Sequence, residues 1–165
     1  MAITVRPPLE GDLAALTFID AAYAAHYDLE ALVTPGALRF FGRTGHSFVA
    51  EDTEDAAGGP VGFVLAQAVW SGERPQVIVA RLATNGSGEA AVALVKALVK
   101  SAYDSGVYDL LARTPPSDAE QRTVLLQEAF FEDPLVQYVR VLGSRGVAAS
   151  QRHAGGALPG ENGRG

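Results

Sequence analysis

A predicted strand, a glycine-rich turn and a long predicted helix follow one another between Gln76 and Leu98, an order that can bind phosphate. The residues Gln76–Ala83 are apolar and β-branched, and the turn Asn85–Gly88 precedes apolar residues at helical spacing. The first amides of a helix have no partner within it, so they can donate hydrogen bonds to phosphate oxygens. Glu89 places a carboxylate at the same point. The pattern therefore predicts either a phosphate-containing ligand or a site that Glu89 closes electrostatically.

Glu51 and Arg81 are charged residues at predicted strand positions. Glu51 could act as a general base through a water molecule. The alternative that we favour is a solvated residue at the start of the acidic turn over residues 51–55. Arg81 interrupts an apolar strand, where an unpaired charge is costly. It would bind a substrate carboxylate in a cleft, pair with an acid of the core, or lie on the open face of the strand.

Three aromatic side chains are candidates for substrate binding. Tyr23 and Tyr27 lie one helical turn apart, and Trp70 ends a predicted strand. The alternatives are packing at the core or its rim for the tyrosines and capping of the core for the tryptophan. The three histidines lack the spacing of metal ligands, so no metal site is predicted. The chain has no cysteine, which excludes disulfides, thiolate catalysis and iron–sulfur clusters.

The elements that would position these residues are indicated by hydrophobic period and by turn residues. Strands are predicted over Ile3–Arg6, Ser47–Glu51, Val61–Trp70, Gln76–Ala83, Val107–Arg113 and Leu135–Leu142. Helices are predicted after an N-cap at Asp12, over Ala37–Phe41, over Glu89–Ser105, and from a Ser117/Glu120 capping box to about Phe131. Hairpins come first and crossover helices later, which is typical of a mixed sheet with helices on both faces.

Length and charge limit the classes of function. A chain of 165 residues with 48% hydrophobic and 19% charged residues is typical of one soluble domain. The formal net charge of −6 argues against non-specific nucleic-acid binding, which needs a basic surface. No apolar run is long enough for a signal peptide or a membrane span, so we expect a cytoplasmic protein without a membrane partner.

The order of elements and the glycine turn resemble the GNAT-type N-acetyltransferases over roughly residues 2–142. The opening residues 3–16 look like the first strand and helix start of that family. The residues 47–51 followed by 59–65 look like its central hairpin, and Val77–Thr84 is similar to the strand whose end binds acetyl-CoA. The resemblance implies an α+β fold with a mixed, mostly antiparallel central sheet flanked by helices on both faces.

The resemblance also assigns cofactor contacts by position. The pantetheine arm would pair with the strand end, and the pyrophosphate would lie in the turn that follows. Ser117, in the place of an asparagine of the family's later signature, would reach a cofactor amide. The implied acetyl-CoA contacts are thus Leu82, Ala83 and Thr84 for the arm, Gly86, Ser87, Gly88, Glu89, Ala90 and Ala91 for the pyrophosphate, and Ser117.

Three further positions depart from the family pattern. Gly86 stands where the phosphate turn of the family begins with a basic or amide residue. Glu89 replaces the middle glycine of the phosphate turn, and Leu126 stands where the family has a proton-donating tyrosine. The resemblance implies transfer of an acetyl group from acetyl-CoA to a primary amine of a small molecule or a protein. The departures support the alternative of a non-catalytic ligand-binding or protein-interaction module that has lost acetyl-CoA binding.

We expect one GNAT-like domain over residues 1–143 and a disordered tail over residues 144–165, which is rich in glycine, alanine and polar residues. The sequence leaves a monomer and a homodimer open. The acceptor amine is not specified either, because acceptor loops vary freely on one fold.

Overall fold

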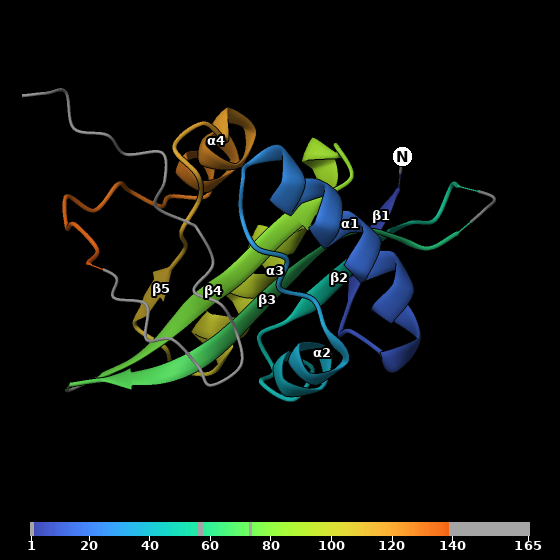
Figure 1. Cartoon of the computed structure of the whole chain (residues 1–165). Helices are drawn as coiled ribbons and strands as arrows, with labels where there is room; N and C mark the ends of the chain where they lie inside the picture. The colour runs from blue at the N-terminus through green and yellow to red at the C-terminus, as the bar shows by residue number, and fades with distance from the viewer. Residues whose placement is uncertain (1, 56–57, 73, 139–165) are drawn as a thin grey trace, which may run out of the picture. The chain divides into compact units, whose positions relative to one another are not determined.

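The computed structural model describes residues 2–55, 58–72 and 74–138 (Figure 1). The chain divides into two compact units, Met1–Phe131 and Glu132–Gly165. All the helices and strands described belong to the first unit. The tail predicted over residues 144–165 lies outside the described residues, so the predicted domain boundary stays a prediction.

A five-stranded sheet forms the centre of the first unit, with its strands in sequence order. Its members are β1 (Ile3–Arg6), β2 (Phe48–Asp52), β3 (Pro60–Ser71), β4 (Arg74–Thr84) and β5 (Asp109–Leu111). The pairs from β1 to β4 are antiparallel, and β5 alone runs parallel to its neighbour β4. The sheet is therefore mixed and mostly antiparallel, which confirms the predicted fold class.

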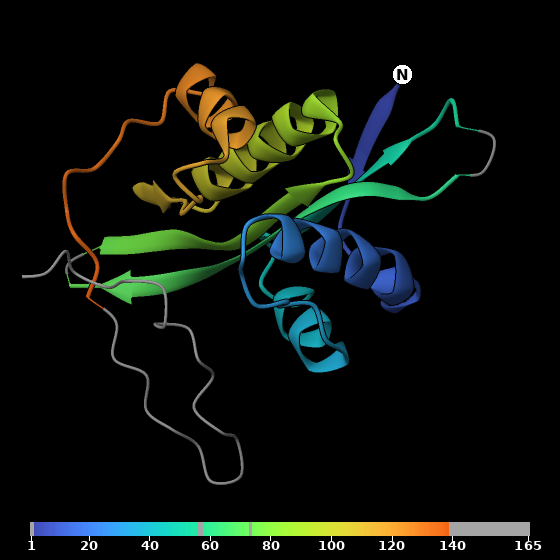
Figure 2. The same ribbon diagram turned by 45° about the horizontal axis from the view of Figure 1, so that its top comes forward.

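Helices cover both faces of the sheet (Figure 2). The helices α1 (Leu13–His26) and α2 (Pro35–Phe41) lie on one face, and a short 3₁₀ turn η1 (Glu10–Asp12) leads into α1. The helices α3 (Gly88–Asp104) and α4 (Ala119–Gln127) lie on the other face. The sheet is therefore the middle layer, with helices packed on each of its two faces.

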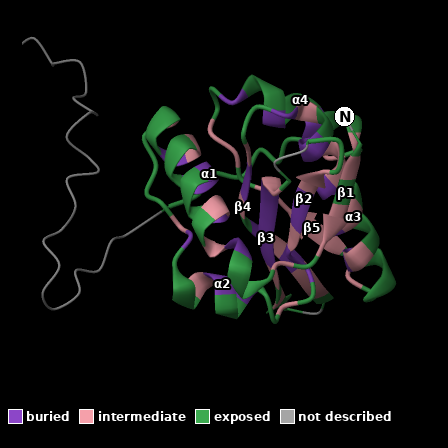
Figure 3. Ribbon diagram, turned by 90° about the vertical axis from the view of Figure 1, so that its right-hand side faces the viewer, coloured by how far each residue is buried: buried purple, intermediate pink, exposed green. Residues whose placement is uncertain are grey.

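Two apolar cores lie on opposite faces of the sheet, because successive strand side chains point to opposite faces. Val49, Phe63 and Leu65 are buried with α1 and α2. Ala50 and Val64, their direct neighbours in sequence, are buried with α3 and α4. Figure 3 shows the resulting buried stretches on the central strands.

Gly62 allows close packing where β3, β4 and α3 meet. A Cβ atom on Gly62 would lie 2.8 Å from the Thr84 side chain and 3.3 Å from that of Leu94. Gly62 pairs with Thr84 across the β3–β4 ladder. The absence of a side chain at Gly62 therefore lets α3 begin directly against the end of β4.

Three predicted elements differ in the structure. The strand predicted over Val107–Arg113 is only β5, because β4 pairs with it over three residues. The last helix begins at Ala119 behind an Asp118 cap, since the Asp118 carboxylate accepts the Gln121 N–H at 2.9 Å. No strand is present over residues 135–138 of the strand predicted for Leu135–Leu142, and residues 139–142 lie outside the described residues.

The Asp12 cap was also wrong in its chemistry. Asp12 precedes α1, but its side chain does not cap that helix. Its carboxylate instead accepts two hydrogen bonds from the Arg6 guanidinium and one from the Leu9 N–H. This pairing holds the pKa of Asp12 below its ordinary value, with the Arg6 hydrogen bonds as the largest cause.

Candidate functional site

The strands β4 and β5 separate and leave part of a strand edge open. They pair only at Gln76 with Asp109, Val77 with Leu110 and Ile78 with Leu111. The pairing with β3 shifts register at this point, so that Ala80 is an extra residue in β4. An extra residue bends a strand. Beyond Ile78 the β5-facing edge of β4 has no strand partner among the described residues.

The open edge presents backbone groups of Leu82 and Thr84. The Leu82 carbonyl faces this side, because it accepts a 2.8 Å hydrogen bond from the Gln121 side chain on α4. The N–H of Asn85 points the other way, to the Val61 carbonyl on β3 at 2.9 Å. Since backbone groups alternate sides along a strand, the N–H groups of Leu82 and Thr84 face the opening. Two backbone donors thus lie where β4 leaves the sheet.

The first turn of α3 follows directly and presents further donors. Ser87 caps the helix, and its hydroxyl accepts the N–H of Ala90 at 3.2 Å. The amides of Gly88 and Glu89 are the first of the helix and have no intrahelical acceptor. Ala90 and Ala91 are buried, and their N–H groups already donate to the hydroxyl and the carbonyl of Ser87. The predicted phosphate turn therefore forms as a capped helix start.

Glu120 brings a second carboxylate to this helix start. A Cβ atom on Gly88 would lie 3.2 Å from the Glu120 Oε1. Glu120 comes from the first turn of α4, and Glu89 from the first turn of α3; both side chains are exposed. Lys96 lies two turns along α3, lines a surface hollow with Gly88 and Glu89, and pairs with Glu128 at 3.7 Å. The helix start is thus acidic on its surface.

A buried polar cluster lies beside the open edge of β4. Tyr23 of α1 donates a 2.8 Å hydrogen bond from its hydroxyl to the Asp118 Oδ2. The Gln121 side chain approaches the same hydroxyl at 3.4 Å. Burial, followed by the hydrogen bond to Asp118, raises the pKa of Tyr23 well above its ordinary value. Thr114 also lies close enough to influence that pKa, although its buried hydroxyl makes no hydrogen bond of its own.

Arg81 pairs with a core acid, which was one of its three predicted alternatives. Its Nε lies 3.4 Å from the Asp20 Oδ1, and the two side chains are 9% and 1% exposed. The guanidinium also donates to the Glu30 carbonyl and lies 5.5 Å from the centre of the Tyr23 ring. Asp20 in turn accepts the N–H groups of Leu32 and Val33. The pair therefore fixes the loop after α1 against β4.

Glu51 lies on β2 within a second ion-paired group. Its Oε1 accepts hydrogen bonds from Arg6 Nε, at 3.0 Å, and from Arg6 Nη2. Arg6 also holds Asp12, so one guanidinium joins β1, β2 and the start of α1. This arrangement leaves the Glu51 Oε2 as the oxygen that could bind a water, and the proposed role as a base stays a prediction.

The remaining predicted residues lie at different distances from the open edge. Tyr27 packs on Tyr23 with ring centres 4.7 Å apart. Ser117 is exposed immediately before the Asp118 cap of α4. Trp70 pairs with Pro75 at the other end of the β3–β4 ladder, eight residues along β3 from Gly62, which is roughly 26 Å. Tyr27 and Ser117 thus adjoin the cluster, and Trp70 does not.

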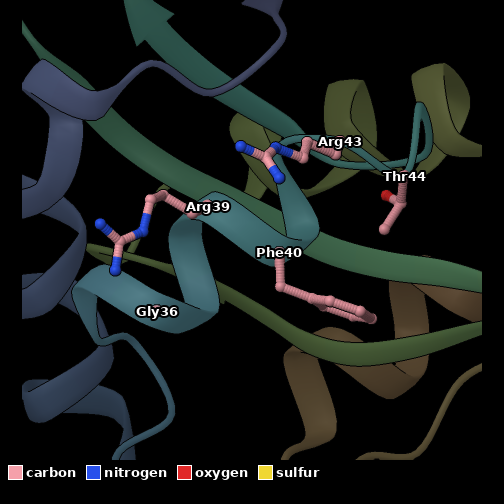
Figure 4. A pocket seen from close by; sticks show the side chains of 5 residues that line it. All are labelled: Gly36, Arg39, Phe40, Arg43 and Thr44. Atoms are coloured by element: carbon pink, nitrogen blue, oxygen red, sulfur yellow. The ribbon is translucent and has the colours of Figure 1, made fainter.

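A hollow on α2 is separate from this region. Gly36, Arg39, Phe40, Arg43 and Thr44 line it, and Figure 4 shows both guanidinium groups on one side of Phe40. The nearby His46 is buried and shares a 2.8 Å hydrogen bond with Ser101 of α3. Burial lowers the pKa of this histidine. His46 is therefore held against α3 and is not among the residues that line the hollow.

Four residues of the site were not predicted as such from the sequence: Asp118, Gln121, Thr114 and Glu120. Their place in the sequence could have indicated them, because all four follow β5, in the segment that lies beside the end of β4 in this fold. A polar residue at the start of a helix is also the ordinary pattern of a cap, and Asp118 has both roles.

Comparison with known proteins decides the family. Residues 20–153 match the family model described as "Protein of unknown function (DUF1999)". The chain belongs to the DUF1999 family. The crystal structure of TTHA1254 from Thermus thermophilus is 46% identical to this DUF1999 chain, with a TM-score of 0.72, and the match covers 86% of this chain and 99% of TTHA1254. No curated protein matches the chain.

Structures of acetyltransferases share the fold at low identity. The ribosomal-protein-alanine N-acetyltransferase from Brucella melitensis biovar Abortus 2308 is 17% identical, with a TM-score of 0.62, over 86% of this chain and 100% of its own. A chain of the NatC complex bound to Gag peptide and CoA is 17% identical, with a TM-score of 0.66, over 79% and 86%. The GNAT-type fold predicted for this DUF1999 chain is thereby confirmed.

Metal-binding clusters and membrane-spanning helices are both absent from the described residues. No group of three or more acidic, histidine or cysteine side chains is arranged to hold a metal ion among the residues described. Within the same part of the chain, no helix has both the length and the apolar character needed to cross a bilayer.

Proposed function

We propose that the chain is an acyltransferase that moves an acetyl group from acetyl-CoA to a primary amine. One observation carries this proposal: the open edge of β4 ends directly at the capped start of α3. The edge offers the strand-like backbone groups of Leu82 and Thr84, and the helix start offers the amides of Gly88 and Glu89. An extended amide-bearing arm that ends in a diphosphate matches these two sets of donors in their order along the chain.

The backbone of the site fits acetyl-CoA better than its side chains do. The amides of Gly88 and Glu89 in the Gly86–Ala91 turn would hold a diphosphate, and Ser117 is exposed just before the Asp118 cap of α4. The carboxylates of Glu89 and Glu120 oppose that charge. Both are exposed, so solvent and salt screen the repulsion. We therefore retain Leu82, Ala83, Thr84, Ser117 and the Gly86–Ala91 turn as the proposed binding residues.

The residues of the proposed reaction have distinct roles, and one of them, Glu51, lies on β2 rather than at the open edge of β4. Bound acetyl-CoA would supply an acyl thioester. The cleft-facing N–H groups of Leu82 and Thr84 would stabilise negative charge on the acyl oxygen. Glu51 would take a proton through a water on its Oε2. Leu126 is 49% exposed and cannot donate a proton, so release of the thiolate would depend on solvent or on another hydroxyl.

The acceptor in this proposal is an amine of a small molecule or a protein. A net charge of −6 suits a cationic amine better than an anionic substrate. Neighbours of the same fold are named as acting on a ribosomal protein or studied with an aminoglycoside, sisomicin. Tyr23 and Tyr27 lie beside the open edge and are the proposed contacts. Arg81, which pairs with Asp20, and Trp70, at the other end of the β3–β4 ladder, are not included.

Calorimetric titration with acetyl-CoA tests the proposal. We would titrate the wild type and a Glu89→Gly variant with acetyl-CoA, CoA and pantetheine. Micromolar binding of acetyl-CoA, weaker for pantetheine, is the expected result, and release of free thiol would then be followed with a panel of amines. Absence of binding by both proteins would overturn the proposal and leave the non-catalytic interaction module as the explanation of the fold.

A further inference from the structure

The hydrogen-bonded pair of Tyr23 and Asp118 lies beside the open edge of β4, and its polar atoms are only partly used. The Tyr23 hydroxyl donates its proton to the Asp118 Oδ2 at 2.8 Å. The lone pairs of the Tyr23 oxygen can then accept hydrogen bonds, and the donor that approaches them is the Gln121 side-chain amide, at a long distance of 3.4 Å. An oxygen of this kind, backed by a carboxylate, is suited to receive an N–H of a charged donor.

The surroundings of this pair favour a cation. Asp118 is 3% exposed, and no lysine or arginine pairs with it among the described residues. Burial, followed by the charge of Asp118, a hydrogen bond with Asp118 and then the charge of Glu120, raises the pKa of Tyr27. The helix α1 ends at His26, which lies between Tyr23 and Tyr27 in the sequence. The C-terminal end of a helix carries a partial negative charge, which also favours a cation here.

A second observation indicates that the cluster is incomplete. The Thr114 hydroxyl is buried and makes no hydrogen bond, although it lies close to Tyr23. A buried hydroxyl without a partner costs free energy, which a ligand donor or acceptor at this place would recover. The rings of Tyr23 and Tyr27, 4.7 Å apart, supply aromatic surface for the carbon next to an ammonium group.

We infer that Tyr23 and Asp118 bind the ammonium group of the acceptor, with the Tyr23 oxygen accepting one of its N–H bonds and Asp118 supplying the charge through Tyr23. This inference rests on the proposed acyl transfer for its biological meaning, but the site itself is defined without acetyl-CoA. Tyr23 touches the amine, and Asp118 is a positioning residue. The ligand class is a primary alkylammonium.

The test uses three probes of similar shape and different charge. Protein labelled with ¹³C at the tyrosine Cζ gives five resonances, one for each tyrosine, which Tyr→Phe variants assign. We would add n-butylammonium, n-butanol or butyrate at millimolar concentrations. The expected result is a saturable shift of the Tyr23 and Tyr27 resonances with butylammonium alone. An equal response to butanol, or no response to butylammonium, would overturn the inference.

Two variants separate recognition from folding. Asp118→Asn keeps an oxygen that can cap α4, because asparagine is as good an N-cap as aspartate. It removes the negative charge behind the Tyr23 oxygen, so butylammonium should bind at least about tenfold more weakly. Tyr23→Phe keeps the ring that faces Arg81, and the Tyr27 resonance should no longer shift with butylammonium in this variant. Glu10→Gln removes a remote charge and should leave the shift unchanged. Unchanged binding by Asp118→Asn would refute the role of its charge.

The titration is independent of the acyl donor. A protein that binds acetyl-CoA but ignores butylammonium would keep the proposed function and lose the ammonium site. A protein that binds butylammonium but not acetyl-CoA would keep the ammonium site and lose the proposed function. The Asp118→Asn variant adds a spectroscopic check: the Tyr23 resonance should titrate at lower pH than in the wild type, because Asp118 contributes to its raised pKa.

Discussion

Removing the carboxylate of Glu120 should strengthen binding of acetyl-CoA. Glu120 reaches the start of α3, where its Oε1 would lie 3.2 Å from a Cβ on Gly88. The same place carries the free amides proposed to hold a diphosphate. A Glu120→Gln substitution keeps the size of the side chain and removes its negative charge. The change therefore isolates the electrostatic part of the interaction.

The magnitude follows from the separation of the charges. A phosphate oxygen bonded to the amide of Gly88 would lie ~3 Å from that nitrogen, which puts the Glu120 carboxylate roughly 6 Å away. Two unit charges at about 6 Å in water repel by roughly 0.7 kcal/mol. A diphosphate carries more than one charge, and salt screens part of the repulsion. The net effect is about 1 kcal/mol, or roughly a fivefold lower Kd.

Calorimetry at two salt concentrations checks this estimate. The gain from Glu120→Gln should shrink at high salt, because screening weakens the repulsion that the substitution removes. Glu10→Gln is the matched control, since it also removes one negative charge. Glu10 lies in η1, and the 14-residue α1, which is about 20 Å long, separates it from the end of α1 that meets the site. Equal gains from Glu120→Gln and Glu10→Gln would refute the local argument, as would a gain that does not depend on salt.

Three further substitutions test the neighbouring contacts. Gln121→Leu removes the donor to the buried Leu82 carbonyl, so it should lower the free energy of unfolding, measured in urea, by ~1–3 kcal/mol. Because acetyl-CoA would compete with Gln121 for that carbonyl, the substitution should also strengthen acetyl-CoA binding, and weaker binding would contradict this competition. Arg81→Met leaves Asp20 as a buried unpaired charge and should cost ~3–5 kcal/mol in the same urea assay, whereas a loss below about 1 kcal/mol would contradict the pairing. Burial lowers the pKa of His46 in the folded protein, so its neutral form stabilises the fold above about pH 6.5, and this contribution is lost as the pH falls through the lower folded pKa. The melting temperature should therefore fall less between about pH 7.5 and 5 for His46→Gln than for the wild type, and an equal fall in both proteins would contradict this role of His46.

The fold could be predicted where the signal was local. The alternation of Ile3–Arg6 gives β1 its observed bounds, and the apolar run before the glycine turn gives β4. The periodicity after Gly88 predicts α3 to within one residue at each end. In each case the side-chain pattern and the turn residues agree with the tertiary structure, so local information was sufficient.

Tertiary contacts decided the elements that were predicted wrongly. Ser117 and Glu120 have the spacing of a capping box, but Asp118 is the residue that also meets Tyr23, and the helix starts behind it. The length of β5 depends on the bend that the extra residue Ala80 gives to β4. Neither the partner of a cap nor the divergence of two strands is visible in the residues of one segment.

The candidate site was predicted in part for the same reason. The sequence indicated that Glu51 and Arg81 were unusual, because charges interrupt or end apolar strands. Their partners Arg6 and Asp20 come from β1 and α1 and could not be deduced from spacing. The donors at the start of α3 were predicted from the strand–turn–helix order, and those of β4 through the family resemblance. The polar cluster around Asp118 was not predicted.

The first turn of α4 joins the parts of the site that come from different elements. Asp118 holds Tyr23 of α1, Glu120 reaches the start of α3, and Gln121 donates to the Leu82 carbonyl of β4. These three side chains lie within four residues of one another, so a single helical turn fixes all three contacts. A donor arm that pairs with the Leu82 carbonyl would compete with Gln121 for that oxygen, and weakening of this hydrogen bond would act on the turn that holds Glu120 and Asp118. We therefore expect binding at the β4 edge to alter both the charge at the start of α3 and the position of the Tyr23 hydroxyl, because Asp118, Glu120 and Gln121 share one helical turn.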